Sequence, residues 1–312
     1  MIENKESMTA KLCAFARAFY SSANQTSPNN DYLAKELLGR HEYASIHEMI
    51  KTGQCPGICP SYNHHCNVHD TVCKYLAPIP ISRDIFASEK FDEFSKKHGN
   101  CQYIICGAGL DTFSFRNQNE NIEVFEIDHP STQRFKLERI KQLDWKFNRN
   151  IHFVSVDFSK DNMMHNLIEN GYNPYQPAFF IILGLTYYLT IEQIRSLVEK
   201  ISAVAWAPSA LILDYPNKDI HIGERVRRLS KMTENLGEKM TGDFDVDDFI
   251  SILNMTEYYY IEHYTPSDIQ KNYLNGQTNL MAFKTFTSYT PKSNTHKIIN
   301  RADPCFYCCG HK

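Results

Sequence analysis

The chain has 312 residues, of which 42% are hydrophobic and 22% are charged, and its formal net charge is -3 at pH 7. This length can bury a large core, and the composition is that of an ordinary globular protein. The small net charge gives no reason to expect nucleic acid or an anionic membrane as a partner, and no run approaches the roughly 20 apolar residues that span a bilayer.

The amino-terminal end is polar over residues 1–6 and lacks the apolar core of a signal peptide, so we expect a cytoplasmic protein. In that compartment the ten cysteines would be thiols or metal ligands, because disulfides are rare there. We also expect a monomer.

The first hundred residues are predicted to be mainly helical. Within residues 9–38, Leu12, Phe15, Ala16 and Phe19 recur at the spacing of one helix face. Residues 41–80 are predicted to be irregular because they are rich in Cys, His, Pro and Tyr, and a helical pattern resumes over 81–98. We assign 1–98 to a helical amino-terminal cap over the acceptor site, with a Cys/His-rich insertion at about 41–80.

From residue 99 the chain alternates between short apolar runs and helical stretches. Strands are expected at 102–106, 123–128, 152–157, 178–183 and 209–214, and helices at 131–144, 161–170 and 190–205. Thr190 and Gln193 have the spacing of a capping box at the start of the last of these helices. The nearly continuous apolar run at 179–183 implies burial on both faces, which indicates a parallel sheet.

Two further helices, at about 220–238 and 245–254, precede the apolar runs 257–264 and 280–287. The two runs are separated by a turn-rich connector and would form an antiparallel pair at the sheet edge. The resulting α/β fold has a seven-stranded, mostly parallel sheet within a core at 99–290. Residues 291–312 are predicted to be a polar, Cys-rich tail outside this core.

A glycine turn follows the first predicted strand, and an acid ends the second. Gly107-Ala108-Gly109 lets the backbone approach a ligand closely, and Asp128 can accept both hydroxyls of a ribose. A dinucleotide fingerprint would have a third glycine where this chain has Thr112, and Asp111 would repel a pyrophosphate. The pattern therefore favours an adenosine ligand without phosphates and with a positive centre, namely S-adenosylmethionine. Alternatively, Asp111 or Thr112 merely caps the next helix.

These features together predict a class I, Rossmann-like methyltransferase. The chain resembles the leucine carboxyl methyltransferase family, including its bacterial branch of S-adenosylmethionine-dependent methyltransferases, over about residues 9–290. The matching motifs, in chain order, are Thr9-Ala10 with Ala16-Arg17-Ala18, Ser82-Arg83-Asp84, Gly107-Ala108-Gly109-Leu110-Asp111-Thr112 with Phe115-Arg116, Phe125-Glu126-Ile127-Asp128-His129-Pro130 with Lys136, Val156-Asp157-Phe158, and Gly184-Leu185-Thr186-Tyr187-Tyr188-Leu189.

The resemblance implies roles for individual residues. Arg83 would bind the cofactor carboxylate, the 107–109 turn would pass beneath its methionyl and ribose groups, and Asp128 would hold the ribose. Taken alone, Arg83 could equally be a surface cation, Asp157 a strand-end cap and the tyrosines packing residues. The full assignment is cofactor contact for Arg83, Gly107, Ala108, Gly109, Asp128, Asp157, Phe158 and Leu183, and acceptor contact for Arg17, Tyr187 and Tyr188.

Leu183 departs from the family pattern, which usually has a glutamate beside the cofactor's methionyl end. Without that carboxylate the cofactor's ammonium loses a partner, at a cost of about 1–3 kcal/mol if nothing replaces it. Another acceptor could compensate. The alternative is a non-catalytic or regulatory protein that binds the same cofactor. Thr112 disfavours a third interpretation, a nicotinamide-dependent oxidoreductase.

The expected reaction is O-methylation of a carboxylate, on a small acid or on a protein carboxyl terminus. A carboxylate with an ordinary pKa of about 4 is ionised at neutral pH and needs no general base. We therefore expect no catalytic side chain, only residues that align the acceptor and exclude water.

Cysteine and histidine gather in two places. Cys55/Cys59 and Cys305/Cys308 have the spacing of paired zinc ligands, but the second pairing in each group is irregular. A structural metal and a thiol-rich insertion both remain open. The residues concerned are Cys55, Cys59, His64, His65, Cys66, His69 and Cys73, and in the tail Cys305, Cys308, Cys309 and His311.

Overall fold

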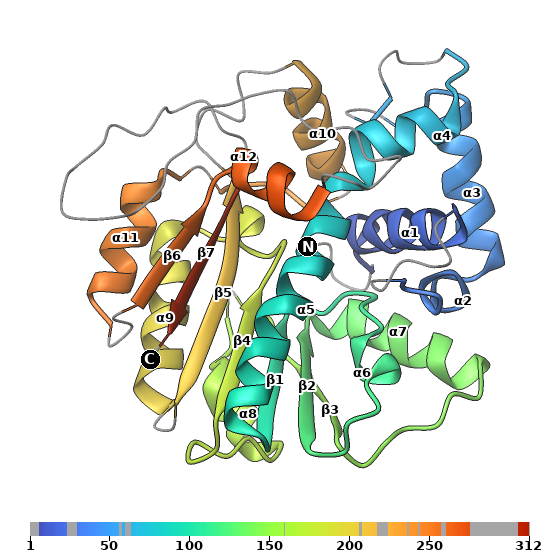
Figure 1. Ribbon diagram of the computed structural model, residues 1–312. Coiled ribbons are helices and arrows are strands. Elements are labelled where there is room, and N and C mark those ends of the chain that lie inside the picture. Colours follow the sequence, from blue (N-terminus) through green and yellow to red (C-terminus); the bar gives the residue numbers. More distant parts are fainter. Residues whose placement is uncertain are drawn as a thin grey trace.

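The computed structural model describes residues 6–23, 30–55, 58–59, 64–158, 160–205, 208–216, 224–235, 237–242, 244–256, 260–274 and 305–311. A central sheet has helices on both faces, and a group of amino-terminal helices lies against one end of it (Figure 1). None of the described helices is long and apolar enough to cross a membrane.

Five parallel strands form the main part of the sheet, close to the predicted positions. They are β1 (Cys101–Cys106), β2 (Ile122–Asp128), β3 (Ile151–Ser155), β4 (Ala178–Ile182) and β5 (Ser209–Pro216). All residues of β1, β4 and β5 are buried, as strands covered on both faces require. The order along the whole sheet is β3-β2-β1-β4-β5-β7-β6, so the direction of strand succession reverses between β1 and β4.

The antiparallel edge differs from the prediction. β6 (Tyr260–Tyr264) lies within the predicted run 257–264, whereas the run 280–287 lies outside the described residues. Its expected place is taken by β7 (Cys305–His311), which pairs antiparallel with both β5 and β6. The assignment of these residues to a tail outside the core was therefore wrong. Phe306 and Tyr307 favour a strand, and pairing on both sides satisfies the backbone of β7.

Helices cover both faces of the sheet. One face packs against α8 (Met163–Glu169), α9 (Ile191–Val204) and α11 (Val246–Asn254). The other packs against α5 (Pro78–His98), α12 (Pro266–Ile269) and the π-helix at Gln270–Leu274. The predicted capping box of α9 is confirmed, because Gln193 N donates to Thr190 Oγ1 at 3.3 Å and Thr190 N donates to Gln193 Oε1 at 2.8 Å. α10 (Glu224–Asn235) falls within the predicted range 220–238.

The amino-terminal helices share a separate core with the end of the sheet. This core joins α1 (Met8–Ala23), α2 (Ala34–Leu38) and α3 (Arg40–Lys51) to Leu110 and to Ile140 of α7 (Pro130–Gln142). α3 contradicts the prediction that residues 41–80 are irregular. Tyr43, Ile46 and Ile50 have helical spacing, and the last two are buried, but the Cys- and His-rich composition obscured this pattern.

The rest of the 41–80 segment contains α4 (Val68–Thr71) and a π-helix at Val72–Leu76 before α5 begins at Pro78. A proline in the first turn of a helix loses no hydrogen bond, so Pro78 favours the start of α5 there. α5 then runs across the front of the sheet (Figure 1) and carries one face of the cavity described below.

Candidate active site

A cavity of about 500 Å3 lies at the carboxyl ends of β1, β2 and β4. Ligands of open α/β sheets bind where the strand order reverses, which here is the crevice between β1 and β4. All the predicted site residues except Tyr187 contribute to its lining. They are Arg17, Arg83, Gly107, Ala108, Gly109, Asp128, Asp157, Phe158, Leu183 and Tyr188.

The glycine turn has a backbone that requires glycine. Gly107 and Gly109 have φ values of 77° and 53°, in the left-handed region that other residues rarely adopt. A Cβ at Gly109 would also lie 3.1 Å from the Cβ of Ala10 on α1. The amides of Gly107 and Ala108 donate to the carbonyl of Ile127 at 2.8 and 3.0 Å, which fixes the turn against the end of β2.

Asp128 ends β2 and faces the cavity beside this turn. Its carboxylate accepts the amides of Gly109 at 2.5 Å and His129 at 2.6 Å. Burial raises the pKa of Asp128 to about 6, although these two amides act in the opposite direction. The residue is 9% exposed, so a ligand hydroxyl can reach a carboxylate whose orientation the backbone sets.

Glu126, two residues before Asp128 in β2, does not line the cavity. Both Glu126 and Lys136 are about 1% exposed and form a buried ion pair. Ser114 Oγ donates to Glu126 Oε1 at 2.5 Å, and Lys136 Nζ also donates to the carbonyl of Asp111 at 2.5 Å. This group therefore supports the glycine turn from behind.

Asp157 and Phe158 lie just beyond the end of β3 and line the cavity. Lys160 Nζ is 3.2 Å from Asp157 Oδ2, and His129 Nε2 is 3.9 Å from the same oxygen. Phe158 is partly buried against the core beneath the sheet. The two residues bring a carboxylate and an aromatic ring to the cavity lining.

Arg83 of α5 is fixed at the ends of β4 and β5. Its Nε and Nη2 bind Asp214 Oδ2 at 2.8 and 2.5 Å, and the amide of Gly184 donates to Asp214 Oδ1 at 2.6 Å. A Cβ at Gly184 would lie 3.0 Å from Arg83 Nη1, so glycine allows this close approach. Sequence reasoning missed Asp214, although an acid at the end of the apolar run 210–213 was an available signal.

Tyr187 and Tyr188 lie on the 3-10 helix Thr186–Tyr188 but in different surroundings. Tyr187 does not line the cavity. Its ring centroid is 5.4 Å from the Arg83 guanidinium carbon, the geometry of a cation–π contact. Tyr188 lines the cavity and its hydroxyl donates to Thr9 Oγ1 at 3.0 Å.

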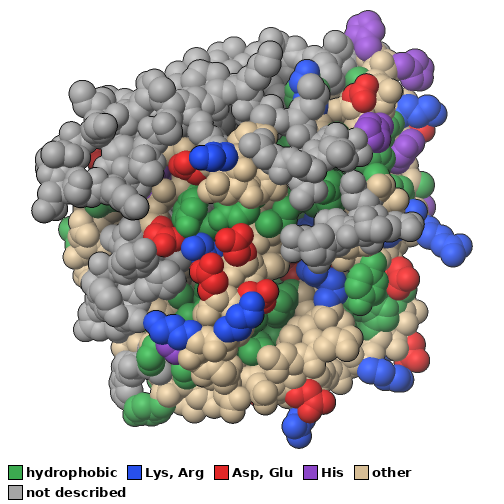
Figure 2. All heavy atoms as spheres, in the orientation of Figure 1, with side chains coloured by type: hydrophobic (Ala, Val, Ile, Leu, Met, Phe, Trp, Pro, Cys, Tyr) green, Lys and Arg blue, Asp and Glu red, His purple; other side chains and the backbone are tan. Residues whose placement is uncertain are grey.

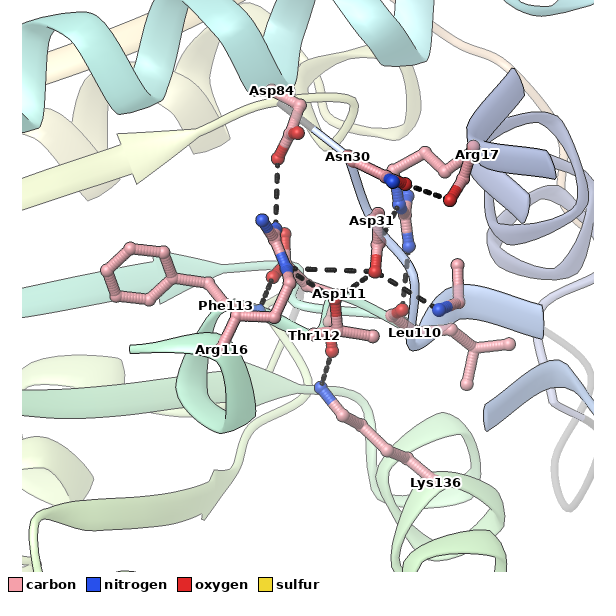
Figure 3. A network of polar contacts seen from close by, with 12 residues as sticks. Arg17, Asn30, Asp31, Asp84, Leu110, Asp111, Thr112, Phe113, Arg116 and Lys136 are labelled. Carbon is pink, nitrogen blue, oxygen red and sulfur yellow. Dashed lines mark hydrogen bonds and ion pairs between the residues drawn. The ribbon is translucent and has the colours of Figure 1, made fainter. Parts of the chain in front are cut away.

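A polar network ties the amino-terminal helices to the glycine turn (Figure 3). Arg17 Nε binds Asp31 Oδ2 at 2.9 Å, and Arg17 Nη2 donates to the carbonyl of Leu110 at 2.7 Å. Thr112 Oγ1 donates to Asp31 Oδ1 at 2.5 Å. Burial raises the pKa of Asp31, but the guanidinium groups of Arg17 and Arg116 outweigh burial and hold it below its ordinary value. Arg17 thus lines the cavity and also joins α1 to the turn.

The capping alternative holds for one of the two residues after the turn. Asp111 Oδ1 accepts the amide of Phe113 at 2.6 Å, at the start of α6 (Phe113–Arg116). Thr112 makes no capping hydrogen bond with its side chain and instead binds Asp31.

Glu238 closes another side of the cavity and was not predicted. Its carboxylate accepts the amides of Met8 and Thr9 at 2.5 and 3.2 Å and the hydroxyl of Thr9 at 2.5 Å. Ser7 Oγ donates to it as well, at 3.2 Å. An acid at the amino terminus of α1 is favourable because the helix dipole is positive there. The contact spans about 230 residues, so no local sequence signal announces it.

The Cys/His-rich segment does not form a metal site in the part of the chain that the structure describes. Cys55 and Cys59 are buried, whereas His64, His65 and His69 are exposed. Figure 2 shows histidines at the surface over α3 and α4. The tail residues Cys305, Cys308, Cys309 and His311 lie in β7, a different part of the fold.

With this geometry in place, comparison with known proteins decides the family. The profile of the family described as leucine carboxyl methyltransferase matches residues 10–202. The chain belongs to that family. YktD of Bacillus subtilis strain 168, named as an S-adenosyl-L-methionine-dependent methyltransferase, is 30% identical over 302 residues, covering 91% of this chain and 97% of YktD. The present chain is likewise an S-adenosylmethionine-dependent methyltransferase.

Other matches cover less of the chain. A protein of Mycobacterium bovis strain BCG / Pasteur 1173P2, with the same activity in its name, is 31% identical over 155 residues, 47% of this chain and 42% of that protein. Magnesium protoporphyrin IX methyltransferase (ChlM) from Synechocystis PCC 6803, solved with bound SAH, is 11% identical, with a TM-score of 0.42 over 75% of this chain and 85% of ChlM.

Proposed function

We propose that this methyltransferase methylates a carboxylate oxygen of its acceptor. The observation that carries the proposal is the family match over residues 10–202, because the family description names a carboxyl group as the methyl acceptor. The cavity supports a methyltransferase function because it gathers all eight residues that the sequence assigned to the cofactor.

The residues of the cavity fit S-adenosylmethionine. Asp128 would hold the ribose hydroxyls, Asp157 and Phe158 the adenine, and Arg83 the methionyl carboxylate. Glycine at positions 107 and 109, both with positive φ, has no side chain to obstruct the ligand there. A volume of about 500 Å3 is in the usual range of small-molecule sites, roughly 300–1,000 Å3.

When bound, the cofactor supplies a methyl group on a positively charged sulfur. The protein's part is to hold the acceptor oxygen in line and to keep water out, which can contribute several kcal/mol. Thr9, Tyr188 and Glu238 are joined by hydrogen bonds along one wall and can serve that purpose. A carboxylate acceptor is already ionised, so no residue needs to take a proton.

The acceptor side would be formed by the amino-terminal helices acting as a cap, with Arg17 and Tyr188 in its wall. Arg17 is joined to Asp31 and Leu110, so its guanidinium is held in place before an acceptor arrives. The acceptor is either a small acid or a protein carboxyl terminus. A monomeric, cytoplasmic enzyme with the domain division near residue 98 remains part of this proposal.

The first test is ligand class. S-adenosylmethionine and S-adenosylhomocysteine should raise the melting temperature, because a ligand that binds only the folded state stabilises it. NAD and NADP should leave it unchanged. Stabilisation by NAD alone would contradict the cofactor assignment.

The second test is the acceptor. Release of S-adenosylhomocysteine should be measured with a panel of small carboxylic acids, peptides with free or amidated carboxyl termini, and thiols. Turnover is expected with free carboxylates and not with the amidated peptides. Tight cofactor binding without turnover on the whole panel would favour a non-catalytic protein, and turnover on thiols alone would overturn the carboxylate proposal.

A further inference from the structure

The methionyl end of S-adenosylmethionine carries an ammonium as well as a carboxylate, and both need partners in the cavity. Arg83 can receive the carboxylate. Leu183, at the end of β4, has an apolar side chain that cannot accept a hydrogen bond from the ammonium. Among the described residues, the carboxylates that line the cavity are those of Asp84, Asp111, Asp128, Asp157 and Glu238.

Most of these carboxylates already bind other groups in the wall of the cavity. Asp128 accepts two backbone amides at the ribose position, and Glu238 accepts four hydrogen bonds at the start of α1. Asp157 lies beside Lys160 at the adenine end. Asp111 caps α6 through the amide of Phe113.

Asp84 is different. Among the residues that the structure describes, it has one hydrogen-bonding or ion-pairing partner, Arg116, whose Nη2 lies 3.3 Å from Asp84 Oδ1. Its side chain is 13% exposed, and it lines the cavity. Figure 3 shows Asp84 pointing from α5 toward Arg116. Its second carboxylate oxygen is therefore available to a cation in the cavity.

Asp84 also stands next to Arg83 on the face of α5 that lines the cavity. That face follows the helical period through Pro80, Arg83, Asp84, Ala87 and Ser88. Arg83 leans toward Asp214 at the end of β5, and Asp84 leans toward Arg116 just after the glycine turn. One helix face thus presents a positive and a negative group side by side, which is the arrangement that a zwitterionic amino acid requires.

We propose that Asp84 binds the α-ammonium of the cofactor, so that Arg83 and Asp84 together hold its amino-acid end. The inference rests on the cofactor placement proposed above. It assigns to Asp84 the ammonium contact that a carboxylate at position 183 would otherwise make.

The test compares two ligands that differ only in the ammonium. The affinities of S-adenosylhomocysteine and of its analogue with hydrogen in place of the α-amino group are measured by calorimetry at pH 8. The wild-type protein should prefer S-adenosylhomocysteine by about tenfold to a hundredfold, the range of a charge-assisted hydrogen bond. Asp84→Asn should abolish most of this preference. A merely structural role would weaken both ligands equally.

Three further variants sharpen the test. Asp92→Asn, an exposed acid on the same helix, should keep the preference, and so should Asp111→Asn. Leu183→Glu should restore the preference when it is added to Asp84→Asn, because it places a carboxylate at the end of β4. Loss of preference in Asp111→Asn instead of Asp84→Asn would overturn the assignment. So would an Asp84→Asn protein with unchanged preference and reduced turnover, which would indicate a proton acceptor.

A pH series on the wild-type protein is a further test, and it does not depend on the folding of any variant. The charged groups that face Asp84 are Arg116 of α6, Asp111 of the turn, Asp31 before α2 and Arg17 of α1. Burial raises the pKa of Asp84 to about 6. The preference for the ammonium should therefore shrink between pH 7 and pH 5, while effects of Asp128 cancel between the two ligands. Equal affinity for both ligands at every pH would overturn the inference and leave the proposed function intact, whereas failure of both to bind would overturn the cofactor placement itself.

Discussion

At the β1–β2 end of the cavity, the groups that set the site come mainly from residues 107–129, whereas the β4–β5 end joins elements from across the chain. The first end is a backbone turn with positive φ values and one acid held by neighbouring amides. The second depends on Arg83 of α5 meeting Asp214 of β5, and on Glu238 meeting the start of α1. Local sequence therefore determines the β1–β2 end, and tertiary contacts determine the β4–β5 end.

The largest effect is expected from a substitution of Asp214, at the β4–β5 end of the cavity. Asp214 is fully buried, and Asp214→Ala would leave Arg83 and the Gly184 amide without its carboxylate. Removing one member of a buried pair costs about 3–5 kcal/mol, so the free energy of unfolding in urea should fall by about that amount. The exposed Asp92→Ala on α5 is the control, expected within about 0.5 kcal/mol of wild type. Equal losses in the two variants would mean that the Arg83–Asp214 pair does not hold this end together.

A substitution at the β1–β2 end should change ligand affinity more than it changes the stability of the fold. Asp128→Ala removes the carboxylate that faces the ribose position and should weaken S-adenosylhomocysteine by about a hundredfold, close to 3 kcal/mol. Calorimetry on folded protein measures this, with Glu120→Ala, an exposed acid before β2, as the control. Unchanged affinity in a folded Asp128→Ala protein would show that the ribose lies elsewhere.

The contrast between local and long-range contacts also explains which features could be predicted from the sequence. The five parallel strands, the α9 capping box and the Gly107–Asp128 constellation follow from periodicity and from residues close in sequence. α3 was missed because the Cys-, His- and Pro-rich residues that follow it obscured its helical spacing. The partner of β6 was misplaced because strand pairing at an edge is decided by tertiary packing. Glu238 and Asp31 could not have been found, since only the folded chain brings them to α1 and Thr112.

A third prediction uses the opposite pH dependences that Asp128 should give to the stability of the fold and to ligand affinity. Burial raises the pKa of Asp128 in the folded, ligand-free protein to about 6, above the unfolded value of about 3.9. A raised pKa contributes stability that is present below the unfolded pKa and lost as the pH rises through 6. Ligand hydroxyls favour the ionised carboxylate, so affinity for S-adenosylhomocysteine should change in the opposite direction.

The measurement uses the S-adenosylhomocysteine analogue with hydrogen in place of the α-amino group, so that protonation of Asp84 does not contribute. The expected size is about tenfold weaker binding at pH 5 than at pH 7, because only about a tenth of a carboxyl with a pKa near 6 is ionised at pH 5. The Asp128→Ala protein should lose most of this dependence. Binding that strengthens toward pH 5 would contradict a role for ionised Asp128.

The smallest effect concerns the long-range tie between Glu238 and α1. Glu238→Gln keeps an acceptor oxygen but removes the charge that faces the amides of Met8 and Thr9 and the positive end of the helix. The free energy of unfolding should fall by about 1 kcal/mol, the usual worth of a charged group at a helix amino terminus. Glu234→Gln, an exposed acid on α10, is the matched control and should change stability by less than about 0.5 kcal/mol. Because Glu238 lies on the proposed acceptor side of the cavity, Glu238→Gln should leave the affinity for S-adenosylhomocysteine within about twofold of wild type while raising KM for the acceptor. A variant that weakened S-adenosylhomocysteine as much as the acceptor would show that the two ends of the cavity are not separable.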